Sequence, residues 1–187
     1  MKTFQELQEG VYDPNILKAF FLAGGPGSGK SYVVSRGVGG LGMKIVNSDD
    51  IFEKYIDDAG MTWKMQSKLG KEQEADRDKL RDRAKEVASK QQANYVEGRL
   101  GLIIDGTGKD YDSITRKAQK LRLLGYDIHM IFVNTSLDIA LKRNAERKRT
   151  LRPDIATKSW KSVQGNMGKF SQFFRQGFIL VDNNVAG

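Results

Sequence analysis

Residues Gly24–Ser31 read GGPGSGKS and have the residue types of a phosphate-binding loop. They fit the pattern G-x-x-x-x-G-K-[ST] without a mismatch, and they lie between an apolar run and a helical pattern, as this motif requires. Glycines let consecutive backbone N–H groups point into one hollow, and the start of the next helix adds its positive dipole end. We therefore predict that the nucleotide-binding residues include Gly24, Gly25, Gly27, Ser28 and Gly29.

The last two residues of this motif carry the more specific chemistry. Lys30 is expected to bind the β- and γ-phosphates and to act in catalysis, and the Ser31 hydroxyl is expected to ligate Mg²⁺. A dinucleotide-binding loop would need a glycine where Lys30 stands, so we set that interpretation aside. The motif therefore predicts ATP and Mg²⁺ as cofactors.

Carboxylates follow two further apolar segments. Asp49 and Asp50 follow residues 43–46 after Asn47 and Ser48, at a place where a carboxylate can accept the proton of an acceptor hydroxyl. We assign Asp49 as this base because the helical pattern starts just after it, and Asp50 as the cap of that helix or an outer partner. Asp105 follows the apolar residues 100–104 and has two interpretations, a ligand of Mg²⁺ or a turn residue.

Two arginines lie one helical turn apart before Pro153. Arg143 and Arg147 are at positions i and i+4, and a positioned arginine stabilises the charge that develops in phosphoryl transfer. The segment Glu146–Pro153 is predicted to form a lid that closes over the nucleotide and excludes water. His129 lies in the middle of a predicted strand, so we expect a structural partner for it and no catalytic role.

Strand and helix patterns alternate along the chain. Strands are predicted at residues 16–23, 43–46, 100–104, 126–133 and 178–181, and helices at 30–36, 51–59, 72–95, 111–124, 136–147 and 153–174. This alternation predicts an α/β fold with a five-stranded parallel sheet, helices on both faces and a basic helical lid. Ligands of such sheets bind at the carboxyl ends of the strands, where the polar clusters 24–31, 47–50, 105–107 and 134–136 are expected.

Composition favours one domain, at residues 16–187, after an N-terminal segment 1–15. The chain has 187 residues, no cysteine and a formal net charge of +8. No apolar run approaches the roughly 20 residues that span a bilayer, so no membrane partner is expected. Residues 142–175 contain ten basic and two acidic side chains. Such a stretch attracts a nucleoside triphosphate, a nucleic-acid backbone or both, or it forms a solvated basic helix face.

Four segments in chain order resemble the P-loop kinases that include phage polynucleotide 5′-kinases and the zeta toxins. They are GGPGSGKS, VNSDD (46–50), IIDGT (103–107) and LKRNAER (141–147), and the RPDIATKSW that follows is also similar. The resemblance covers about residues 16–181 and implies the three-layer α/β/α fold of P-loop NTPases. It also implies Asp49 as catalytic base, and Arg143 and Arg147 at the donor phosphates.

One position departs from that family. Many of these kinases place an arginine three residues after the catalytic aspartate, where it meets an acceptor phosphate, and this chain has Phe52 there. The resemblance to a polynucleotide end-kinase therefore does not extend to this contact.

We expect an ATP- and Mg²⁺-dependent phosphotransferase that moves the γ-phosphate to a hydroxyl of a nucleic acid or nucleotide. Three alternatives stay open: a zeta-toxin-like nucleotide-sugar kinase, a kinase of hydroxymethyl groups on DNA bases, and an ATP-binding switch without transfer. The resemblance implies a place in the cytoplasm of an infected host cell.

The first residues, MKTFQELQEG, carry a second resemblance. They are similar to the capsid-targeting segment of internal head proteins of large tailed phages, which is cleaved after a Leu-x-Glu pattern, here Leu7-Gln8-Glu9. This implies that the protein is packaged in the phage particle. An ordinary amphipathic helix, with Phe4 and Leu7 at positions i and i+3, is the alternative.

Overall fold

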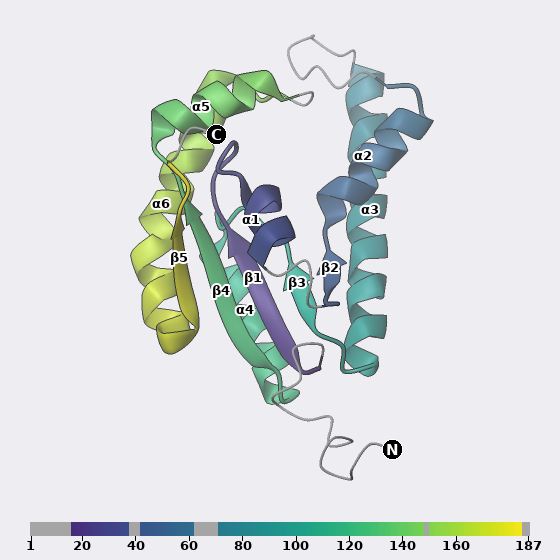
Figure 1. Ribbon diagram of the computed structural model, residues 1–187. Helices are drawn as coiled ribbons and strands as arrows, with labels where there is room; N and C mark the ends of the chain where they lie inside the picture. The colour runs from purple at the N-terminus through teal and green to yellow at the C-terminus, as the bar shows by residue number, and fades with distance from the viewer. Residues whose placement is uncertain (1–15, 38–41, 62–70, 148–149, 185–187) are drawn as a thin grey trace.

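Five parallel strands form one sheet, in the order β2-β3-β1-β4-β5 (Figure 1). The computed structural model describes residues 16–37, 42–61, 71–147 and 150–184. The strands are β1 (Lys18–Ala23), β2 (Lys44–Val46), β3 (Leu102–Ile104), β4 (Asp127–Asn134) and β5 (Phe178–Asp182). The predicted five-stranded parallel sheet is therefore confirmed.

The strand order places the phosphate-binding motif at the centre of one sheet edge. β1 lies between β3 and β4, so the chain leaves β1 toward one side of the sheet and later crosses to the other. Parallel sheets bind ligands at such a switch point, above the carboxyl ends of the strands. The loop that follows β1 is Gly24–Gly29, and it occupies this position.

Helices cover both faces of the sheet (Figure 1). They are α1 (Lys30–Gly37), α2 (Ser48–Asp58), α3 (Lys71–Glu97), α4 (Tyr111–Leu123), α5 (Leu137–Glu146) and α6 (Pro153–Phe174), and a 3-10 turn, η3 (Arg175–Gly177), joins α6 to β5. α1 packs through Val34 against Leu22, Ile131 and Val133 of the sheet. α4 and α6 pack against the opposite face.

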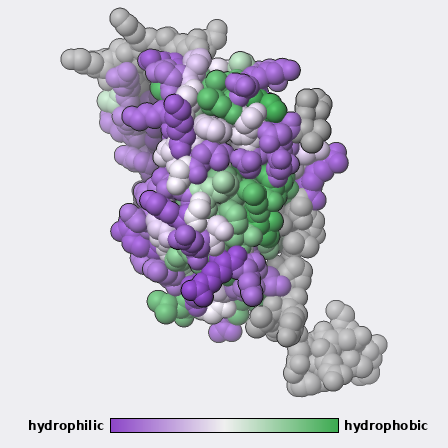
Figure 2. Space-filling model, turned by 90° about the vertical axis from the view of Figure 1, so that its left-hand side faces the viewer, coloured by the Kyte–Doolittle hydropathy of each residue, from purple (hydrophilic) through white to green (hydrophobic). Residues whose placement is uncertain are grey.

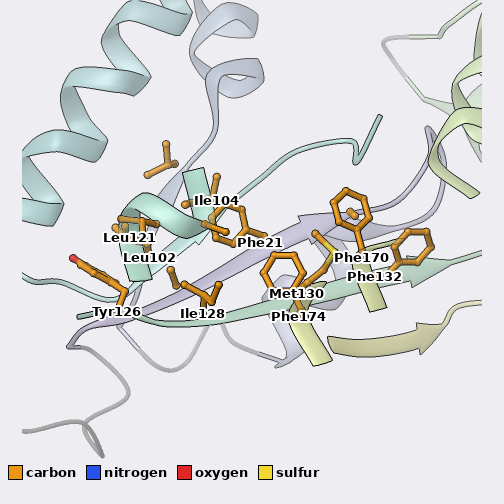
Figure 3. Close-up of a cluster of buried hydrophobic side chains, with 14 of the residues drawn as sticks. Phe21, Leu102, Ile104, Leu121, Tyr126, Ile128, Met130, Phe132, Phe170 and Phe174 are labelled. Atoms are coloured by element: carbon orange, nitrogen blue, oxygen red, sulfur yellow. The ribbon is translucent and has the colours of Figure 1, made fainter. Parts of the chain in front are cut away.

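The main core lies between the sheet and the helices α4 and α6 (Figure 3). Phe21, Met130 and Phe132 project from β1 and β4 toward Phe170 and Phe174 of α6, and all five side chains are buried. Full burial of such a side chain contributes about 1.5–3 kcal/mol. Phe170 and Phe174, near the end of α6, therefore belong to the core.

Helices α2 and α3 form a separate pair beside β2 (Figure 1). Phe52 and Ile56 of α2 pack against Ala84 of α3, and Phe52 is only 1% exposed. The guanidinium carbon of Arg81 lies 5.0 Å from the centre of the Phe52 ring. Phe52 therefore fastens α2 to α3, which explains why an apolar residue stands at the position where the resembling kinases have an arginine.

His129 has the structural partners that its place in a strand predicts. Its ring stacks on Phe20 at a centroid distance of 4.9 Å, and its Nε2 lies 2.8 Å from an Asp127 carboxylate oxygen.

Edge strand β5 leaves Ile179 and Leu180 exposed, and Figure 2, which looks onto the side with α6 and β5, shows a hydrophobic area among hydrophilic residues.

Within the described ranges, no helix is long and apolar enough to cross a bilayer. The N-terminal segment 1–15 and its proposed cleavage site lie outside the described residues, so capsid targeting stays a prediction.

Candidate active site

The loop between β1 and α1 has the curled backbone that its glycines predict. Gly27 and Gly29 have φ values of 78° and 85°, in the left-handed region that glycine adopts without strain. Gly24 N–H donates to the Thr107 carbonyl at 3.0 Å, which ties the loop to the segment after β3. α1 begins at Lys30, so its positive dipole end faces the loop.

Gly27 also lacks room for a side chain. A Cβ there would lie 2.1 Å from the Ala140 carbonyl oxygen of α5. We expect Gly27→Ala to lower the free energy of unfolding by about 1–3 kcal/mol, because both the φ value and the contact would have to change. Gly165→Ala in α6 is the matched control, since a Cβ there meets nothing within 4 Å. It should raise the melting temperature by about 2–4 °C, and calorimetry that ranks the two variants otherwise would contradict this packing.

The ends of β4 and β5 hold the loop in place. The Ser28 carbonyl accepts hydrogen bonds from Thr135 Oγ1 at 3.2 Å and from Asn183 Nδ2 at 2.8 Å. The Asn183 carbonyl in turn accepts from Arg143 Nη1 at 3.0 Å. One asparagine after β5 therefore connects the phosphate-binding loop to an arginine of α5.

Trp160 of α6 supports the same loop from the side. Its Nε1 donates to the Thr135 carbonyl at 2.8 Å, and its Cδ1 lies 3.2 Å from the place that a Cβ of Gly25 would occupy. The indole thus packs directly against the loop backbone, and a side chain at Gly25 would require the indole to shift by a few tenths of an ångström.

Lys30 reaches back over the loop and donates to the Gly24 carbonyl at 2.8 Å. Burial lowers the pKa of its ammonium group, the positive charge of Arg147 adds to this, and the carboxylates of Asp105 and Asp49 oppose it. One cation, a second nearby cation and two carboxylates therefore act on one another at this edge of the sheet.

The helix that carries Asp49 begins earlier than the hydrophobic pattern predicts. α2 starts at Ser48, and its cap is Asn47, whose Oδ1 accepts from Asp49 N–H at 2.9 Å. The interpretation of Asp50 as the cap, and of a helix start at residue 51, is therefore wrong. Asp49 and Asp50 both lie exposed in the first helical turn, where the helix dipole favours negative charge.

Asn47 also contacts the third carboxylate. Its Nδ2 donates to Asp105 Oδ2 at 3.1 Å, while Asp105 Oδ1 is buried without a hydrogen-bond partner among the described residues. Burial raises the pKa of Asp105, the positive charge of Lys30 opposes this, and Asp49 and Asp50 add to it.

A buried carboxylate oxygen without a partner, together with an exposed serine hydroxyl in the first turn of α1, fits a hard cation such as Mg²⁺. Those two groups are Asp105 and Ser31. The described part of the chain has no cluster of three or more His, Cys, Asp or Glu side chains that could hold a metal. Phosphate oxygens and water would therefore supply the other ligands, as is usual for Mg²⁺ bound with a nucleotide.

Asn47 allows the two contacts to be separated by mutation. Asn47→Ala should destabilise the protein by about 1 kcal/mol because it removes the cap of α2. Asn47→Ser restores a capping hydroxyl but not the reach to Asp105, so it should recover most of the stability. Urea unfolding measures both changes, and equal losses in the two variants would show that the cap contributes nothing.

Arg143 and Arg147 lie on the opposite side of the loop from α2. A Cβ at Gly29 would be 3.7 Å from Arg143 Nη1, and Arg147 ends α5 as its C-cap. Within the predicted lid Glu146–Pro153, the first residue ends α5 and the last begins α6, and the described residues between them, 147 and 150–152, are not helical. Asn144 folds this connection back, since its Nδ2 donates to the Leu151 carbonyl at 2.8 Å and its Oδ1 accepts from Leu151 N–H.

The structure gathers the predicted residues at one sheet edge and adds four that the sequence analysis missed. The additional residues are Asn47, Asn144, Trp160 and Asn183. Asn47 and Asn183 directly follow β2 and β5, so the rule that polar residues after strands face the ligand could have identified both. Nothing in the spacing of Asn144 or Trp160 marks either residue. The roles of Asp49, Arg143 and Arg147 in catalysis stay predictions.

The parallel sheet, the glycine loop and the lysine that closes it define a P-loop nucleotide-binding domain. The chain belongs to the AAA_33 family, whose model, an AAA domain, matches residues 20–169. No curated protein sequence is significantly similar to this chain.

Solved structures share this fold at low sequence identity. The AvrRxo1-ORF1:-ORF2 complex with ATP matches with a TM-score of 0.67 and 14% identity, over 88% of this chain and 54% of that one. A structure of the PezAT toxin–antitoxin system of Streptococcus pneumoniae matches with a TM-score of 0.62 and 15% identity, over 89% of this chain and 68% of that one. The Pnkp1/Rnl/Hen1 RNA repair complex matches with a TM-score of 0.58 and 19% identity, over 83% of this chain and 46% of that one. This chain therefore spans about half the length of the AvrRxo1-ORF1:-ORF2 chain that it matches.

Proposed function

We propose that this protein is an ATP- and Mg²⁺-dependent kinase that transfers the γ-phosphate to a hydroxyl of a nucleic acid or nucleotide. The observation that carries the proposal is that Asn47 contacts both the Asp49 N–H, at 2.9 Å, and the Asp105 carboxylate, at 3.1 Å. This places a candidate base and a candidate metal ligand on one side chain, at the sheet edge where Lys30 closes the phosphate-binding loop.

The residues then take distinct roles in the transfer. The acceptor oxygen forms a bond to the γ-phosphorus while the bond from phosphorus to the bridging oxygen breaks, and ADP leaves. Asp49 accepts the hydroxyl proton. Lys30, Arg143 and Arg147 face the negative charge of the transferring group. Ser31 and Asp105 would hold Mg²⁺, which neutralises charge on the β- and γ-phosphates when bound.

Basic charge near the site favours an anionic acceptor. The chain carries a formal net charge of +8, and Arg143 and Arg147 lie beside the loop on α5. Nucleic acids and nucleotides are the acceptors whose charge such a surface attracts most strongly.

The test is transfer of labelled γ-phosphate to a panel of acceptors. We expect labelling of 5′-hydroxyl DNA or RNA, or of a nucleoside, above that of UDP-sugars and hydroxymethylated DNA. Labelling of UDP-sugar or hydroxymethylated DNA alone would replace the proposed acceptor. ATP binding without any labelled acceptor across the panel would favour the non-catalytic switch.

A further inference from the structure

Helices α4 and α6 lie side by side on one face of the sheet and form a basic surface there. Together with the first residue after α6 they contain eight basic and two acidic side chains. The basic residues are all exposed: Arg116, Lys117, Lys120, Arg122, Lys158, Lys161, Lys169 and Arg175. Half of these belong to α4, outside the basic stretch 142–175 that the sequence analysis singled out. Only the fold brings the two groups together.

A cavity of about 590 Å³ opens where these two helices end. Its lining consists of Arg122, Gln172, Phe173, Phe174 and Arg175. The Arg122 guanidinium carbon lies 5.5 Å from the centre of the Phe173 ring. Neither Arg122 nor Arg175 makes an ion pair with a carboxylate in the described part of the chain. Two uncompensated guanidinium groups beside an aromatic ring suit a phosphate that is joined to a flat base.

Arg175, which lines this cavity, has a backbone conformation that is unfavourable for arginine. Its φ and ψ angles are 50° and −116°, a combination that glycine adopts far more readily than arginine. The strain means that the fold keeps a positively charged side chain where a glycine would make a more stable turn. Strained residues of this kind gather at binding sites.

We propose that the basic surface of α4 and α6 binds a single-stranded nucleic acid, one nucleotide of which enters the cavity at Arg122, Phe173 and Arg175. The cavity lies at the amino ends of the strands, since Arg175 precedes β5 and α4 precedes β4. The P-loop lies at the carboxyl ends, and the eight-residue strand β4 between the two levels is about 26 Å long. This surface therefore holds the body of the nucleic acid, away from the transfer site.

This inference deepens the proposed function, because it makes the acceptor a polynucleotide rather than a free nucleotide. The expected transfer to that polynucleotide rests on the proposed function, whereas its binding does not. A dinucleotide is too short to reach from the cavity to the P-loop. A chain of 20 nucleotides reaches both.

The binding test is fluorescence anisotropy of the full chain, without ATP, with a labelled 20-nucleotide oligodeoxythymidine. Arg122→Ala and Arg175→Gly should each weaken binding about tenfold and reduce the salt slope by about one. Phe173→Leu keeps an apolar side chain but loses stacking, and should also weaken binding about tenfold.

Arg99→Gly is the matched control. Arg99 is exposed, has a φ of 55° and does not line the cavity, so this change removes the same charge and the same kind of strain. Both glycine variants should melt at a temperature equal to or above that of the wild type, which separates lost binding from unfolding. Arg99→Gly should bind within about twofold of the wild type. Cavity variants that bind as well as Arg99→Gly would overturn the inference.

Transfer kinetics separate this inference from the proposed function. In Arg175→Gly, the ratio of kcat/KM for the 20-nucleotide acceptor to that for a dinucleotide should fall about tenfold, and Arg99→Gly should leave it unchanged. Transfer to the long acceptor with an unchanged ratio in Arg175→Gly would refute nucleic-acid binding by this surface, while the proposed kinase function would stand. Binding that depends on Arg175, without transfer to any nucleic acid, would support the binding surface and refute the proposed acceptor.

Discussion

Lys30→Met should lower the rate of phosphate transfer by about 10²–10³-fold while leaving the fold intact. Methionine has a similar length but no charge, so it removes the group that faces the β- and γ-phosphates. Burial lowers the pKa of this ammonium in the ligand-free protein, and a charge that burial penalises contributes little to folding. The variant should therefore melt at or above the wild-type temperature, as circular dichroism would measure.

Proton uptake gives a second measurement of the same residue. A triphosphate beside Lys30 favours the charged ammonium, so ATP binding should raise the lowered pKa and take up protons at alkaline pH. Calorimetry in buffers of different ionisation enthalpy detects this uptake. Lys30→Met should abolish it, and Lys44→Met, an exposed lysine on β2, should leave both uptake and transfer unchanged. Persistent uptake in Lys30→Met would mean that another group senses the phosphates.

The sequence predicted the sheet and the loop because both depend on local patterns. Short apolar runs bounded by turn residues, such as residues 100–104, favour buried strands, and GGPGSGKS predicts a curled loop, in which Gly27 and Gly29 adopt positive φ values. The start of α2 was wrong for a physical reason. Residues 47–50 are all polar and read as a turn, yet an asparagine cap and two carboxylates at the positive end of a dipole favour the first turn of a helix.

Contacts between segments that are distant in sequence could not be predicted in the same way. Asn183 meets Ser28 across 155 positions, and Trp160 meets Thr135 only because α6 packs beside the end of β4. Those contacts follow from the strand order, which alternation of strands and helices leaves undetermined. The shared surface of the basic residues of α4 and α6 also follows from the strand order, since this order places α4 beside α6.

The last prediction tests the base itself. Asp49→Asn should lower kcat by about 10²–10⁴-fold and leave ATP affinity nearly unchanged, because an amide cannot take the proton of the acceptor hydroxyl. Asp50→Asn is an unusually close control. Both aspartates lie exposed in the first turn of α2, so either change removes one charge from the same helix end.

Single-turnover transfer to a 5′-hydroxyl oligonucleotide, with ATP affinity measured separately, distinguishes the two variants. If Asp49 accepts the proton, Asp50→Asn should stay within a few fold of the wild type in both measurements. Equal losses of transfer rate in the two variants would show that Asp49 acts only through its charge at the end of the helix and not as the base. Transfer that survives in Asp49→Asn would move the search for the base to another carboxylate of the site, such as Asp105.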